Sequence, residues 1–350
     1  MEKRFKILFF GHDYFGGQFL KVIIENYSDK IEVVGVSTNM QTQNVSLSKK
    51  VKKAKILLRK NLFLQELKEK IFFENIINRK SLKNSPPIHP DIKVKAIAEQ
   101  YNIPLFDSSI VYSGDTGTID AFGAEYIIIA SFGRIPAEVY CNKPSSVINF
   151  HPSLLPKLRG GCPVYTAIMR QLKETGFSFH HLSQQFDAGP LLYQEKITVN
   201  ETHSCRELEI EISKAGANKL YYLLTGMENG TIVPSVTSSL KPSYCFKSYE
   251  IVTRLKPLTS NTEQILRQIK ACASWMLGSA YLRVGFRHFF IIEVQAIILD
   301  SSLLKSDIDF VNGYGVIMRT KDGVLALKKV YYQNEYYCGT DLLKLKNLLF

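Results

Sequence analysis

Two short segments of the chain hold the residue types that acyl transfer requires. In the first, Asn149 and His151 stand two positions apart at the end of an apolar run that starts at Val147. Residues two apart in an extended strand face the same side, so an amide and an imidazole converge on one point. In the second, Asp187 is followed by Ala188–Pro190, whose Gly and Pro favour a tight loop that can present a carboxylate to a histidine.

The chemistry of these side chains predicts a separate role for each of them. Asn149 would donate a hydrogen bond to an oxyanion, His151 would donate a proton, and Asp187 would orient the imidazole. Taken alone, a histidine at a strand end is more often a structural hydrogen-bonding group, and the residues by themselves leave that alternative open. His12, His180 and His181 are expected to be structural.

The helices and strands that must position these residues follow from the pattern of apolar residues. Short apolar runs, typical of buried strands, alternate with segments whose apolar residues recur at helical spacing, which favours a Rossmann-like, doubly wound, mostly parallel sheet. Open sheets of this kind bind their ligands at the carboxyl ends of the strands, where Asn149 and His151 are expected. The turn at 11–17 lacks the G-x-G-x-x-G spacing, so dinucleotide binding is disfavoured. We expect strands at 6–10, 31–36, 126–130 and 146–149, and helices at 13–26, 92–99 and about 201–224.

The sequence pattern changes late in the chain from alternating strands and helices to strands and turns, which predicts a second domain. Strand-like stretches alternate with turn signals such as Asn312-Gly313 and Asp322-Gly323, which indicates a small β-rich domain. The expected boundaries are a catalytic domain at 1–235, a linker at 236–243 and a C-terminal domain at 244–350.

A long basic stretch interrupts the first domain at about 39–90. Its segment from Lys49 to Lys60 contains seven basic residues and no acidic one. Such a run is either a solvated helix face or a loop that contacts nucleic acid.

Composition disfavours a membrane-spanning, a zinc-binding or a disulfide-linked protein. The chain has 350 residues and a formal net charge of +12, which makes a polyanionic partner plausible, and it has no apolar run long enough to span a bilayer. Its six cysteines show neither the spacing of a zinc site nor a disulfide framework, and no presequence is visible.

The string N-F-H-P-S-L-L-P at 149–156, with F-D-A-G at 186–189, resembles the signature of the 10-formyltetrahydrofolate-dependent formyltransferases. Segments 9–15 and 130–136 are also similar to that family. The resemblance implies that Asn149, His151 and Asp187 are catalytic and that no metal takes part. It also implies that the folate co-substrate contacts Phe132, Gly133, Arg134, Ile135, Ser153, Leu154, Leu155 and Pro156.

Within the family, R-G-G-C-P at 159–163 resembles the methionyl-tRNA formyltransferases. The C-terminal part, with Trp275, resembles their OB-like tRNA-binding barrel. The resemblance implies formyl transfer to the amino group of initiator methionyl-tRNA, by a monomer without a membrane anchor. The residues expected to bind tRNA are Lys49, Lys50, Lys52, Lys53 and Arg159.

The basic stretch departs from this family's short Arg- and Gly-rich loop, which leaves specific recognition of the tRNA acceptor end in doubt. Sugar-nucleotide N-formylation, formyltetrahydrofolate hydrolysis and a non-catalytic RNA-binding role remain alternatives. The divergent loop and the composition favour the mitochondrial matrix, with the bacterial cytoplasm as the alternative location.

Overall fold

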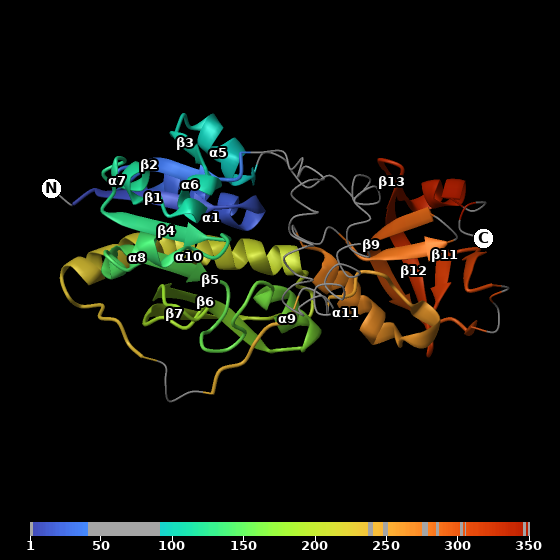
Figure 1. Cartoon of the computed structure of the whole chain (residues 1–350). Coiled ribbons are helices and arrows are strands. Elements are labelled where there is room, and N and C mark those ends of the chain that lie inside the picture. Colours follow the sequence, from blue (N-terminus) through green and yellow to red (C-terminus); the bar gives the residue numbers. More distant parts are fainter. Residues whose placement is uncertain are drawn as a thin grey trace, which may run out of the picture. The chain divides into compact units, whose positions relative to one another are not determined.

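The computed structural model describes residues 3–40, 92–236, 241–247, 251–274, 279–284, 287–301, 304, 306–345 and 348. These residues form two compact units, seen in Figure 1. The first holds the described residues up to Cys245 except Ile168–Arg170, and the second holds Ile168–Arg170 and the described residues from Phe246 onwards. No helix in the described part of the chain is long and apolar enough to cross a membrane.

The first unit is built on a seven-stranded sheet with the order β3-β2-β1-β4-β5-β6-β7. The strands from β3 to β5 are parallel to one another, whereas β6 and β7 add antiparallel neighbours. The chain reverses its direction of progress across the sheet between β1 and β4, as in doubly wound folds. The strands are β1 (Phe5–Gly11), β2 (Ile31–Thr38), β3 (Leu105–Asp107), β4 (Tyr126–Ala130), β5 (Val147–His151), β6 (Glu174–His181) and β7 (Leu191–Thr198).

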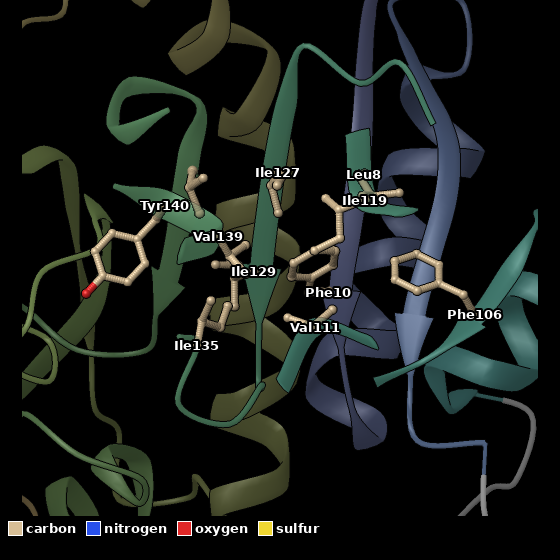
Figure 2. Close-up of a cluster of buried hydrophobic side chains, with 11 residues drawn as sticks. Leu8, Phe10, Phe106, Val111, Ile119, Ile127, Ile129, Ile135, Val139 and Tyr140 are labelled. Carbon is tan, nitrogen blue, oxygen red and sulfur yellow. The ribbon is translucent and has the colours of Figure 1, made fainter. Parts of the chain in front are cut away.

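Both faces of this sheet are buried because successive residues of its central strands are apolar. Phe19 of α1 stacks on Phe9 of β1 and lies 4.6 Å from Phe150 of β5, measured between ring centroids. On the opposite face, Phe10 belongs to the cluster of buried side chains drawn in Figure 2, to which α6, α7 and α8 contribute. The helices of the unit are α1 (Asp13–Tyr27), α5 (Val94–Gln100), α6 (Ser108–Ser113), α7 (Thr116–Asp120), α8 (Ala137–Tyr140) and α10 (Cys205–Glu228); α9 (Pro163–Met169) begins in it.

Helix α10 holds β5 in place. Its start is fixed by a capping box, in which Ser204 Oγ accepts from the backbone N–H of Glu207 and Glu207 accepts from that of Ser204. Further along, Gly216 lies so close to Phe150 that a Cβ at this position would come within 2.1 Å of the ring. A glycine is therefore required where α10 packs on the strand that carries Asn149 and His151.

The second unit is an antiparallel β half-barrel. Its six-stranded sheet has the order β10-β11-β12-β9-β8, with β13 paired to β12. Together with the mostly parallel sheet of the first unit, this confirms the predicted fold class. The elements are α11 (Thr262–Cys272), β8 (Tyr281–Val284), β9 (Arg287–Ile297), β10 (Ile308–Val311), β11 (Gly315–Arg319), β12 (Val324–Tyr332) and β13 (Glu335–Cys338).

Candidate active site

The carboxyl end of β5 carries Asn149 and His151 on one side of the strand, as the alternation predicts. Strand β6 runs antiparallel beside it, and the register pairs Asn149 with His180 and His151 with Ser178. Paired positions in adjacent strands bring side chains of the same face together. The sheet therefore adds a second histidine to the predicted group.

Asp187 lies in the loop that follows β6. Its backbone has a φ of 51°, and its side chain is buried. The loop must bend sharply, since a Cβ at Gly189 would lie 1.8 Å from the carbonyl oxygen of His181. Asp187 Oδ2 accepts a hydrogen bond of 2.8 Å from the backbone N–H of Gly160 and lies 3.7 Å from His151 Nδ1. The structure therefore brings Asn149, His151 and Asp187 together.

One hydrogen bond fixes the orientation of the His151 ring. Its Nε2 lies 3.1 Å from the carbonyl oxygen of Leu158, which can only accept, so Nε2 carries a hydrogen. Nδ1 is left to face Asp187. Leu158 has a φ of 56°, and its N–H donates to Ser243 Oγ at 3.1 Å. The orientation of the His151 ring thus depends on the turn at Leu158, which is held by a hydrogen bond to the distant Ser243.

Most of the S-L-L-P turn is buried, with Leu154 partly exposed. Ser153 is fully buried and donates through Oγ to the carbonyl oxygen of Lys157, and Leu155 is buried as well. Ser178 Oγ accepts from the N–H of Leu155 at 3.0 Å and from Gln194 at 2.8 Å. In this structure Ser153 and Leu155 support the turn, and Leu154 and Pro156 complete it.

A pocket opens beside Asn149 and Asp187. Its walls include the predicted folate contacts at 132–135, together with apolar side chains of Ile129, Tyr140 and Leu182 and the loop 183–187. Arg134 closes one side by donating to the carbonyl oxygen of Gln184 at 3.3 Å. A pocket whose lining combines apolar side chains with an amide and a carboxylate suits a ligand with a polar reacting centre.

His12 lies at the end of β1, next to this pocket. Its ring stacks on Phe132 with 4.4 Å between centroids, and its Nδ1 accepts from the backbone N–H of Asn39. Burial lowers the pKa of His12. Its Nε2 lies 3.2 Å from the hydroxyl of Tyr112, which also accepts from the N–H of Gly133. His12 thus steadies the wall formed by Phe132 and Gly133.

The predicted tRNA contacts fall in two places. Lys49, Lys50, Lys52 and Lys53 lie outside the described residues. Arg159 is half-buried, and its backbone pairs with the segment around Tyr244: its N–H donates to Ser243, and its carbonyl oxygen accepts from Cys245. Across the described residues, no group of three or more His, Cys, Asp or Glu side chains could hold a metal ion.

His180, which the sequence analysis expected to be structural, lies in this site beside Asn149. Its Nδ1 lies 2.8 Å from the carbonyl oxygen of His181, and its Nε2 lies 3.0 Å from Asn149 Nδ2. Complete burial lowers its pKa to about 4, against the opposing effect of Asp187, whose Oδ1 lies 3.7 Å away. The ring is therefore neutral near pH 7. The signal that could have found it is the pairing of β5 with β6, which the periodicity of either strand alone does not show.

Comparison with known proteins gives a consistent result. A family model described as "Formyl transferase" matches residues 78–224. The chain is 27% identical over 247 residues to a methionyl-tRNA formyltransferase of Sulfurihydrogenibium sp., which covers 69% of this chain and 78% of the relative. It is 29% identical over 202 residues to the protein of that name from Bacillus velezensis, with 56% and 61% covered.

Solved structures share the fold at low identity. HypX from Aquifex aeolicus in complex with tetrahydrofolic acid matches with a TM-score of 0.57 and 15% identity, over 98% of this chain and 47% of that one. An N-formyltransferase from Helicobacter canadensis, in complex with folinic acid and dTDP-3-aminofucose, matches with a TM-score of 0.55 and 16% identity, over 93% of this chain and 99% of that one. At these identities the likeness concerns the fold.

Proposed function

We propose that this chain, whose residues 78–224 match the formyl transferase family model, is a formyltransferase. We propose further that it transfers the formyl group of 10-formyltetrahydrofolate to the amino group of initiator methionyl-tRNA. The observation that carries the proposal is the grouping of three side chains: Asn149 and Asp187 line the pocket, and His151 Nδ1 lies 3.7 Å from Asp187 Oδ2. This set supplies a hydrogen-bond donor, a proton carrier and a carboxylate, which are the groups that acyl transfer from one nitrogen to another requires.

The reaction begins when the amine nitrogen attacks the formyl carbon. The carbonyl bond becomes a C–O⁻ single bond, and an amide N–H of Asn149 stabilises the negative oxygen. The bond between the formyl carbon and the folate nitrogen then breaks, and that nitrogen takes up a proton while the amine loses one. His151 holds the transferred proton on Nδ1, facing the carboxylate of Asp187, and a water molecule beside Asp187 can carry it into the pocket.

The pocket suits the folate co-substrate. Ile129, Ile135 and Leu182 contribute apolar walls, and the loop 183–187 completes the lining. Ring systems bind in pockets with apolar walls, where a few polar groups set their orientation. Folate compounds occupy similar solved structures, which supports the same class of co-substrate here.

Three features favour methionyl-tRNA as the acceptor. Several curated relatives that match the chain at 26 to 30% identity carry that name. The net charge of +12 suits a polyanionic partner. The chain also continues beyond the catalytic unit into a β half-barrel, an architecture that can present a nucleic-acid surface.

An amino sugar nucleotide is the second candidate acceptor. One observation favours it: the structural match to the N-formyltransferase from Helicobacter canadensis extends over 99% of that protein and 93% of this chain. A sugar nucleotide also carries phosphates, so the basic character of the chain does not separate the two acceptors.

A single assay with three acceptors tests the proposal. The purified full chain is incubated with 10-formyltetrahydrofolate and with initiator methionyl-tRNA, a dTDP-amino sugar or buffer alone, and formylated product and released formate are measured. We expect turnover with methionyl-tRNA that His151→Ala lowers by at least about a hundredfold. Faster turnover with the sugar nucleotide would transfer the assignment to the second candidate, and formate release in buffer alone at the same rate would indicate a hydrolase.

A further inference from the structure

His180 and Asn149 are hydrogen-bonded to each other across the paired strands β5 and β6. The Nδ1 of His180 lies 2.8 Å from a backbone carbonyl oxygen, which accepts hydrogen bonds and cannot donate them, so the ring hydrogen is on Nδ1. In the neutral ring Nε2 then has only a lone pair. The group 3.0 Å from Nε2 must be a donor, and the donor of an asparagine side chain is its NH2.

This assignment leaves one of the two amide hydrogens of Asn149 to bind the substrate. An NH2 group has two hydrogens, and one of them binds His180. A ring with its hydrogen on Nε2 would instead require the carbonyl oxygen of Asn149 at that place. The amide would then turn over, and an acceptor would replace the donor on the side where the formyl oxygen becomes negative.

We propose that His180 is a positioning residue for Asn149, whose amide it holds by accepting one Nδ2 hydrogen so that the other is directed at the developing oxyanion. This inference rests on the proposed formyl transfer, and it adds a residue that acts through Asn149 without touching the reacting atoms. Complete burial of His180 supports it, because a rigid partner fixes the donor before the charge develops.

Two substitutions separate this role from structural support of the strand. Gln at position 180 places its amide oxygen near the site of Nε2, where it can accept from Asn149, whereas Asn places its amide near the site of Nδ1, where it can only serve the carbonyl of His181. We expect His180→Gln to keep a kcat at least about tenfold above that of His180→Asn, since one oxyanion donor typically contributes about 10² to 10³. Equal rates, or a faster His180→Asn, would overturn the proposal.

A double-mutant cycle tests whether His180 acts through Asn149. If His180 acts through Asn149, the difference between Gln and Asn at position 180 disappears in an Asn149→Ala background. If the difference persists undiminished, His180 acts in some other way and the proposal fails.

A spectroscopic measurement on the wild-type chain does not depend on activity or on the folding of variants. Nitrogen NMR of protein labelled at histidine and asparagine should show His180 with a protonated Nδ1 and an unprotonated Nε2 coupled to the Asn149 amide nitrogen. A protonated Nε2 would overturn the inference. Inactivity with every acceptor would refute the proposed function instead, and the NMR result would still decide how Asn149 is oriented.

Discussion

Replacement of Asp187 by Asn tests the electrostatic part of the site with the smallest change of shape. An amide oxygen can still accept from the N–H of Gly160, so the loop keeps the hydrogen bond that the carboxylate makes at 2.8 Å. The negative charge 3.7 Å from His151 Nδ1 is removed. At that distance two full charges attract by roughly 4 kcal/mol with an effective dielectric constant of about 20. Because about 1.4 kcal/mol is a factor of ten in rate, this attraction bounds the loss at about a thousandfold.

We therefore expect Asp187→Asn to lower kcat by about 10² to 10³, with KM for folate little changed, since the missing interaction stabilises a charge that the transition state needs. The assay is steady-state formyl transfer, combined with equilibrium binding of the folate and thermal unfolding. Asp120→Asn is the matched control, because Asp120 is half-exposed and pairs with Lys143 at the surface. An Asp187→Asn variant that folds, binds folate and keeps more than roughly a tenth of wild-type kcat would refute the electrostatic role.

Three further outcomes follow from the chemistry of single side chains. His151→Ala should lower turnover by at least about a hundredfold while folate binding survives, and turnover above a tenth of wild type would show that His151 is not the proton donor. Ser178→Ala should lower the free energy of unfolding by roughly 1 to 3 kcal/mol in a denaturant titration, because the buried N–H of Leu155 loses its acceptor; an unchanged midpoint would contradict this. Replacing Lys49, Lys50, Lys52 and Lys53 by Ala should weaken the binding of initiator and other tRNAs alike. It should also reduce the slope of log K against log salt by roughly 0.7 to 0.9 for each tRNA phosphate that a lysine no longer neutralises. An unchanged slope would show that the segment is a solvated face without tRNA contacts.

The sequence predicts those parts of the molecule that depend on local pattern. The strand that ends at Asn149 and His151 follows from a short apolar run, and the bend at Asp187 follows from the Gly and Pro after it. Both faces of the central strands are apolar, which predicts their burial under helices on either side. These features are properties of a few consecutive residues, so a single sequence contains enough information to find them.

The partners of the site could not be predicted in this way. His180 reaches Asn149 only because β6 pairs with β5 in one antiparallel register, and a shift of one residue would turn its ring to the other face. Such a register is set by packing along the whole strand. No pattern within β6 distinguishes His180 from His181: the sequence analysis expected both to be structural, and both side chains are buried in the structure.

Ser243 shows how far the site depends on distant parts of the chain. It stands at the end of the segment expected to be a linker, yet its Oγ accepts from the N–H of Leu158 and its carbonyl oxygen accepts from that of Arg159. Leu158 has a left-handed backbone, and its own carbonyl oxygen holds the ring of His151. The orientation of the histidine is therefore secured through two hydrogen bonds by a residue 92 positions further along the chain, since 243 − 151 = 92. A segment that looks like a connection in the sequence thus belongs to the support of the reacting group.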